Sequence, residues 1–178
     1  MTPRPPLLRK ALPADAPALA TLHDTVWHET YAALAPPEAA RRLDRAHRLR
    51  GWQTALADPV RSAWLAEGPG GALGLVALGP ADAARTAGLP APVAEIKHLY
   101  VAAEARRTGL GRALLGTALD AAAAAGAETA VLGVVRQNYA ARLFYADCGG
   151  REVGDFTDPG PLWRSLMVLV AWDLTARR

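Results

Sequence analysis

The chain has 178 residues, of which 51% are hydrophobic, and its 20 basic and 17 acidic side chains leave a net charge of +3. This length predicts a single domain over residues 1–178, with a core large enough to fold without disulfides. This net charge is too small to indicate nucleic acid as a partner by itself, and none is expected. Arginines do gather within residues 41–50, and we interpret them as a solvated helix face, with contact to a polyanion as the alternative.

The first ten residues, MTPRPPLLRK, lack the apolar run of a signal peptide, and no stretch is long and apolar enough to span a membrane. We therefore expect a cytoplasmic protein without membrane contact. The four histidines and the single cysteine lack the spacing of a metal site, so no metal is expected. Cys148 precedes two glycines and is interpreted as a packing residue, with a nucleophile as the alternative.

The first half of the chain predicts helices followed by strands. A strand over 7–12 precedes a helix over 16–31 that Asp15 caps. Pro36-Pro37 ends this helix, and two further helical pieces follow. They cover 38–50 and 52–57, the strands after them cover 61–67 and 72–78, and residues 79–92 form an exposed loop.

The second half predicts a strand–helix–strand crossover over residues 94–135. The helix over 109–125 is apolar nearly all round, and the strand over 129–135 is apolar enough to be buried on both faces. Such a crossover is parallel and right-handed. A helix capped by Asn138 and two strands, over 151–156 and 162–174, complete a mixed sheet with helices on both faces.

The stretch 106–112, RRTGLGR, lies between the strand over 94–101 and the long helix. Two glycines leave its backbone N–H groups unhindered, and the helix dipole adds roughly half a positive charge, so a pyrophosphate is the expected guest. The Walker motif is absent. The Rossmann motif would need glycine where Leu114 stands.

The remaining pattern, [QR]-x-x-G-x-[GA], resembles the acetyl-CoA-binding motif of the GNAT N-acetyltransferase superfamily. The preceding EIKHLYV resembles that family's fourth strand, and the N-x-x-A-x-x-F-Y of residues 138–145 resembles its later helix. The resemblance covers nearly the whole chain. One departure is Gly150, where the family often has an aromatic residue, and we expect weaker packing there.

The resemblance implies the GNAT fold, an α/β (α+β) architecture. Its mixed, mostly antiparallel twisted sheet has about seven strands, strands 4 and 5 are parallel and splayed, and helices cover both faces. It also implies acetyl-CoA as the cosubstrate, without a metal. The implied cofactor-binding residues are Leu99, Tyr100, Val101, Arg106, Arg107, Thr108, Gly109, Leu110, Gly111, Arg112 and Asn138.

Acetyl transfer to an amine needs a base, because an amine of pKa about 10 is protonated at pH 7, and it benefits from an acid for the thiolate. By the resemblance, Glu95 is the candidate base and Tyr145 the candidate acid. The alternatives are a salt-bridged carboxylate and a core aromatic residue. His98 is a weaker base candidate.

The acceptor site is expected from the first two helices and the strand hairpins, with Trp27, His28, Tyr31 and Trp52 as candidate walls. The resulting hypothesis is an N-acetyltransferase that acts on a primary amine of a small molecule, peptide or protein. The alternative is a non-catalytic GNAT-like module that senses acyl-CoA. A homodimer through the edge of the last strand stays open.

Overall fold

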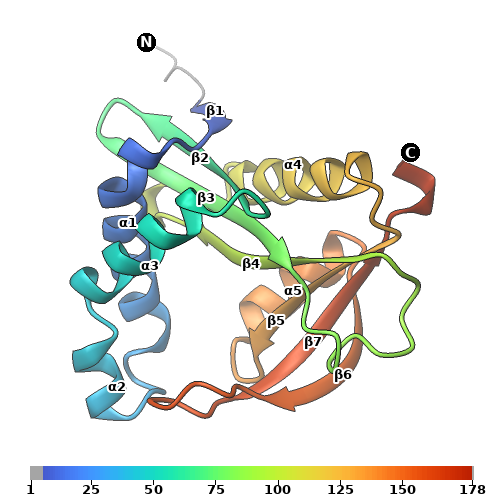
Figure 1. Ribbon diagram of the computed structural model, residues 1–178. Helices are drawn as coiled ribbons and strands as arrows, with labels where there is room; N and C mark the ends of the chain where they lie inside the picture. Colours follow the sequence, from blue (N-terminus) through green and yellow to red (C-terminus); the bar gives the residue numbers. More distant parts are fainter. Residues whose placement is uncertain (1–5, 178) are drawn as a thin grey trace. The chain divides into compact units, whose positions relative to one another are not determined.

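The computed structural model describes residues 6–177, so residues 1–5 and 178 of the predicted domain lie outside it (Figure 1). The helices are α1 (Ala16–Tyr31), α2 (Pro37–Arg42), α3 (Arg45–Ala57), α4 (Leu110–Ala124) and α5 (Tyr139–Asp147). The strands are β1 (Leu7–Lys10), β2 (Ser62–Gly68), β3 (Gly71–Pro80), β4 (Val93–Val101), β5 (Thr129–Val135), β6 (Arg151–Thr157) and β7 (Leu166–Asp173).

Within the described residues, the strands form one seven-stranded mixed sheet in the order β1-β2-β3-β4-β5-β7-β6. β4 and β5 are parallel, in register from Val93↔Thr129 to Glu95↔Val131. β1 with β2, β5 with β7, and β6 with β7 are antiparallel. This arrangement confirms the predicted fold class.

The last strand, β7, is not at an edge of this sheet. It lies between β5 and β6, because the final hairpin folds back and inserts β7 beside the apolar strand β5. The last of the described strands therefore has no free edge for the dimer contact that the sequence left open. The strand at that end of the sheet is β6, whose residues are mostly exposed.

The helices after Pro36 differ from the prediction at one boundary. The chain breaks at Leu43-Asp44 rather than near Gly51, because the Asp44 carboxylate accepts a hydrogen bond from the His47 amide at 2.8 Å and so caps α3. Asp15 was expected to cap α1 in the same way. Its carboxylate instead accepts from the Leu12 amide at 2.7 Å and pairs with Arg9.

The chain divides into two compact units. The first unit comprises the described residues up to Ala77 together with His98–Gly116, and the second comprises Leu78–Lys97 and the described residues from Thr117 onward. The division falls inside β3, β4 and α4, so each of these elements contributes residues to both units.

The core of the first unit joins α1 and α3 to the strands. Leu19, Leu22 and Val26 recur at helical spacing on α1 and are buried with Trp52 of α3 and Leu75 of β3. On the opposite face of β3, a Cβ at Gly74 would lie 2.7 Å from Leu114 and 3.2 Å from Leu110, the first turns of α4. Helices therefore cover both faces of these strands.

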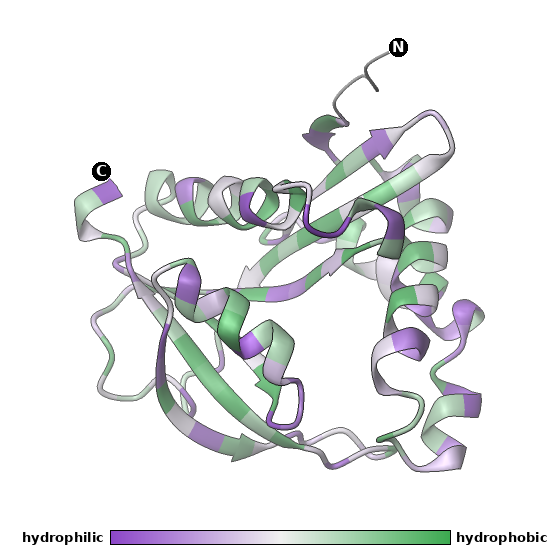
Figure 2. Cartoon of the chain, turned by 180° about the vertical axis from the view of Figure 1, so that it is seen from behind, coloured by the Kyte–Doolittle hydropathy of each residue, from purple (hydrophilic) through white to green (hydrophobic). Residues whose placement is uncertain are grey.

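In the second unit, the face of β7 that presents Leu169 and Ala171 is buried by residues of the loop over 81–92, among them Leu89. This loop was expected to be exposed throughout, yet Thr86 in it is buried. Figure 2 shows β7 as mostly hydrophobic, as a strand covered on both faces should be.

The other face of β7 packs against the end of α5. The Tyr145 ring meets the Trp172 ring edge-on at 5.8 Å, and the Trp172 indole N–H donates to the Cys148 carbonyl at 3.1 Å. Among the described residues, no helix combines the length and apolar character needed to cross a bilayer.

Candidate active site

The loop between β4 and α4 has the backbone of an anion site. Arg107 and Gly109 adopt left-handed conformations, with φ of 61° and 90°, and α4 begins at the next residue, Leu110. Thr108 Oγ1 donates to the Ala105 carbonyl at 2.7 Å and closes the turn. Turns of this kind point backbone N–H groups into a concave surface, at which a helix N-terminus adds positive potential.

The arginines of this loop differ in their contacts. Arg106 donates to Glu29 at 2.8 Å and to the Val101 carbonyl at 3.1 Å, so a carboxylate already neutralises its charge. Arg107 and Arg112 are exposed. Their exposed guanidinium groups and the helix N-terminus together give this loop a positive potential.

The end of β4 contributes Leu99, Tyr100 and Val101, which are all half-buried. The Tyr100 ring stacks on His23 of α1 at 4.6 Å, and burial raises the pKa of its phenol. The Tyr100 side chain therefore packs against α1 within the first unit, and this contact holds the end of β4 next to that helix. The Val101 carbonyl already accepts one bond from Arg106 and has a second lone pair.

His28, one of the predicted acceptor residues, joins α1 to α2. Its Nδ1 lies 2.9 Å from the Asp24 carbonyl and its Nε2 lies 2.9 Å from the Ala40 carbonyl. Because carbonyls only accept, both ring nitrogens must donate, which requires the imidazolium form. The Ala40 bond, followed by the Asp24 bond, raises the pKa of His28.

Trp27 and Tyr31 lie beside His28 on α1 and are also predicted acceptor residues. The Trp27 ring is 5.2 Å from the His28 ring and 6.0 Å from the Tyr31 ring. The guanidinium of Arg48, from α3, lies over the Trp27 ring at 5.2 Å. Trp27 is buried, whereas Tyr31 is half-buried.

Glu95, the candidate base, is buried in the second unit and bound by two cations. Lys97 Nζ lies 2.6 Å from its Oε2, and the Arg85 guanidinium lies 3.4 Å from both oxygens. Glu95 is therefore a salt-bridged carboxylate, which was the alternative interpretation of this residue. Lys97 was predictable as a partner, because residues two apart on a strand lie on the same face. Arg85 was not, because it lies in a loop whose sequence has no periodic pattern.

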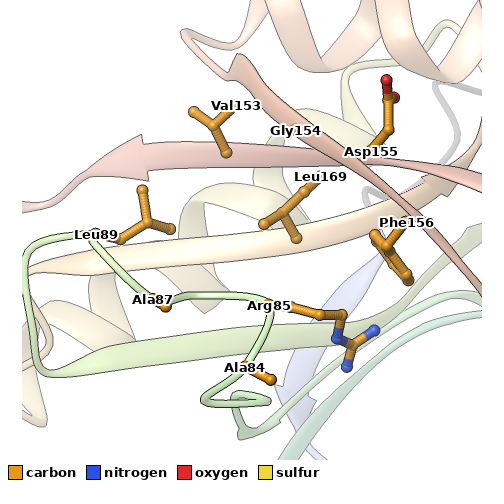
Figure 3. Close-up of a pocket in the computed structure, with 9 residues that line it drawn as sticks. All are labelled: Ala84, Arg85, Ala87, Leu89, Val153, Gly154, Asp155, Phe156 and Leu169. Carbon is orange, nitrogen blue, oxygen red and sulfur yellow. The ribbon is translucent and has the colours of Figure 1, made fainter.

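Arg85 also lines a cavity of about 290 Å³ in the second unit (Figure 3). Its side chain extends toward Phe156, with the guanidinium 4.7 Å from the ring centre. Apart from Arg85 and Asp155 its lining side chains carry no charge, and the lining residues are Ala84, Arg85, Ala87, Leu89, Val153, Gly154, Asp155, Phe156 and Leu169. Through Arg85, this cavity adjoins the Glu95 carboxylate.

Asn138 and Tyr145, the remaining predicted residues, lie on α5. Asn138 caps the helix, because its Oδ1 accepts from the Ala141 amide at 3.2 Å, as predicted. Tyr145 is buried, and its carbonyl accepts from the Gly150 amide at 2.9 Å. Among the described residues, no group of three or more histidine, cysteine and acidic side chains could hold a metal ion.

Known proteins share this fold and sequence pattern. The model of the acetyltransferase (GNAT) family matches residues 22–149. N-acetyltransferase family 8 member 3 of Rattus norvegicus is 33% identical over 115 residues, which are 64% of this chain and 49% of that protein. The chain thus spans about half the length of the curated relatives that it matches.

Two solved structures show the same fold. An N-acetyltransferase from Staphylococcus aureus Mu50 has a TM-score of 0.73 at 21% identity, covering 97% of this chain and 100% of that one. PaiA N-acetyltransferase from Thermoplasma acidophilum, in complex with coenzyme A, has a TM-score of 0.71 at 19% identity, covering 96% and 99%. Since the family model matches well over half of the sequence, the chain belongs to the acetyltransferase (GNAT) family.

Proposed function

We propose that this protein transfers an acetyl group from acetyl-CoA to a primary amine. The observation on which the proposal rests is the loop before α4, where Arg107 and Gly109 hold left-handed conformations beside a helix N-terminus. A chain of the GNAT family with such a loop has the means to bind a pyrophosphate. The coenzyme A bound to the Thermoplasma relative supports this choice of cofactor.

Within this proposal, the backbone of residues 107–112 binds the pyrophosphate, and main-chain groups of Leu99 and Val101 bind the pantetheine arm. The family resemblance assigns Asn138 to cofactor binding. It assigns Tyr145 as the acid that protonates the departing thiolate. Trp172 packs edge-on against the Tyr145 ring and restricts the ring's motion.

Glu95 is the proposed base. Lys97 occupies Oε2 at 2.6 Å, whereas Oε1 has only the longer contact with Arg85, at 3.4 Å. Oε1 is therefore the oxygen that would take the amine proton, directly or through a water molecule. These ion pairs also favour a second candidate function, a module that binds acyl-CoA without turnover, because a buried carboxylate engaged by two cations can serve as a structural ion pair.

Thiol release from acetyl-CoA over a mixed library of amines separates the two functions. An enzyme acetylates at least one class of amine, and Glu95→Gln or Tyr145→Phe lowers kcat with little change in acetyl-CoA affinity. A sensor binds acetyl-CoA and releases no thiol above the uncatalysed rate. Tight binding of acetyl-CoA without turnover of any amine in the library would therefore contradict the acetyltransferase function and support the sensor function.

Gly109→Glu tests the cofactor site itself. The substitution places a carboxylate in a left-handed position at the pyrophosphate loop, and we expect acetyl-CoA affinity to fall at least about tenfold, or 1.4 kcal/mol. Gly126→Glu is the matched control, since Gly126 has φ 91°, no atom within 4 Å of a Cβ, and a place just after the C-terminus of the same helix. Equal affinity in the two variants would contradict the assigned site.

A further inference from the structure

The packing of α1 against α3 buries several polar side-chain atoms that have no hydrogen-bond partner. They are Nδ1 of His23, Oδ1 of Asp24, Nε and Nη2 of Arg48, and Nε1 of Trp52. His23 is 3% exposed and Trp52 is 2% exposed, so these two side chains are almost fully enclosed. Folded proteins rarely leave buried polar atoms unpaired, because their lost hydration is not replaced.

These residues belong to neighbouring faces of the first unit. Arg48 and Trp52 are four residues apart on α3, so they share one face of that helix. The His23 ring lies 6.1 Å from the Trp52 ring and 4.7 Å from the His98 ring. The guanidinium of Arg48 covers the ring of Trp27. The unpaired atoms are thus surrounded by aromatic rings from α1, α3 and β4.

Most of the unpaired atoms are hydrogen-bond donors. Guanidinium and indole groups only donate, and His23 is a neutral imidazole because burial lowers its pKa, so it offers either a donor or an acceptor. The exception is Asp24 Oδ1, which lies 3.2 Å from His28 Nδ1. A guest with several acceptor atoms and a negative charge matches this group, and a carboxylate fits the planar guanidinium best.

The group also lies next to the strand that we assign to the cofactor. His98 and Tyr100, whose rings contact His23, alternate along β4 with Leu99 and Val101. We propose that Arg48 and the Trp52 indole bind a carboxylate of the acetyl acceptor, so that the preferred substrates are amines that also carry a carboxylate. This inference rests on the proposed acetyltransferase function for its choice of ligand.

Binding can be measured without turnover. In a ¹⁵N–¹H spectrum, the indole N–H of Trp52 should shift saturably with sodium 3-phenylpropionate and not with 3-phenylpropionamide. The Trp172 indole, which donates to the Cys148 carbonyl, serves as an internal reference. Arg48→Met should abolish the shift, whereas Arg50→Met, an exposed arginine of the same helix, should retain it. A shift that is the same in wild type and Arg48→Met would overturn the inference.

Kinetics then connect the anion site with the reaction. Amino acids are compared with the amines that lack only the carboxylate, such as L-phenylalanine with 2-phenylethylamine. For the carboxylated acceptors, Arg48→Met should raise KM at least about tenfold, while the plain amines and the affinity for acetyl-CoA stay within about twofold. Equal effects on both sets, with activity retained, would overturn the inference and leave the acetyltransferase function intact. Anion binding through Arg48 without acetylation of any amine would instead overturn the proposed function and leave the anion site.

Stability separates a binding role from a structural one. Removing a buried guanidinium that has unpaired donors should leave the melting temperature unchanged or raise it. Arg48→Lys retains the charge and should recover part of the anion affinity. A clear fall of the melting temperature in Arg48→Met, restored in Arg48→Lys without anion binding, would show that Arg48 only stabilises the fold.

Discussion

Gly150 follows the C-terminus of α5 and lies directly against the sheet. A Cβ at this position would lie 2.7 Å from Val170 and 2.8 Å from Trp172. Separations this short force neighbouring atoms apart, and the contacting atoms belong to buried side chains with little room to move. Glycine therefore fits this position, whereas any side chain would collide with Val170 and Trp172.

We expect Gly150→Ala to lower the free energy of unfolding by about 1–3 kcal/mol, the usual cost of overpacking a core. Urea denaturation measures this directly. Gly51→Ala is the control, because Gly51 lies within α3 and has no atom within 4 Å of a Cβ, so alanine there should stabilise by about 0.5–1 kcal/mol. Stabilisation by both substitutions would contradict the packing explanation.

Single residues also show what the sequence could and could not reveal. The cap formed by Asn138 was predictable, because its hydrogen bond depends only on local spacing. At Gly150 the departure from the family pattern was expected to weaken packing, and this was wrong, because Trp172 is close in space but 22 residues away in the chain. Arg85 beside Glu95 was hidden for the same reason.

His28 is the residue through which α1 holds α2, and its pKa gives that contact a pH dependence. The pKa of His28 is raised above 6.5 by the bonds to the Ala40 and Asp24 carbonyls. A raised pKa means that the folded state binds the proton more tightly than the unfolded state. The stabilisation is therefore complete below pH 6.5 and is lost as the pH rises through the folded pKa.

We expect His28→Gln to remove a component of stability that is complete below about pH 6.5 and falls as the pH rises above that value. His47→Gln should remove a component of the opposite sign, because partial desolvation and the charge of Arg48 lower the pKa of His47, so that its contribution rises as the pH rises toward 6.5. The pKa of His23 is also lowered, so His23 too adds stability as the pH rises. Because both variants keep His23, its contribution cancels when each is compared with wild type. Urea midpoints measured both below and above pH 6.5 give the two differences from wild type, and the same pH dependence for the two variants would contradict the assigned role of His28.

Elements with a strong local signal were predicted best. β5 was predicted over 129–135 and has these bounds, because a continuous apolar run between Gly126 and Asn138 permits little else. The break between the helical pieces was predicted between residues 50 and 52, but it falls at Leu43-Asp44, where the Asp44 side chain caps α3. The burial of Thr86 and Leu89 in the loop over 81–92 follows from tertiary contacts, which no local pattern encodes.

The molecule as a whole raises the question of whether it unfolds in one step. The sequence predicts one domain, whereas the chain divides into two compact units. β3, β4 and α4 each supply residues to both units, and a strand or helix loses its backbone hydrogen bonds cooperatively when one end unfolds. We therefore expect a single calorimetric transition, with equal calorimetric and van't Hoff enthalpies.

Coenzyme A makes this expectation testable, since the proposed pyrophosphate loop belongs to the first unit alone. At a ligand concentration of about 100 times Kd, binding stabilises the folded state by about 2.7 kcal/mol. For a chain of this length, the melting temperature should then rise by roughly 5–11 °C. If the units unfold together, the whole transition moves, and Gly109→Glu abolishes the movement while Gly126→Glu retains it. Two transitions, of which coenzyme A moves only one, would show that the units unfold separately and that the chain is not a single cooperative domain.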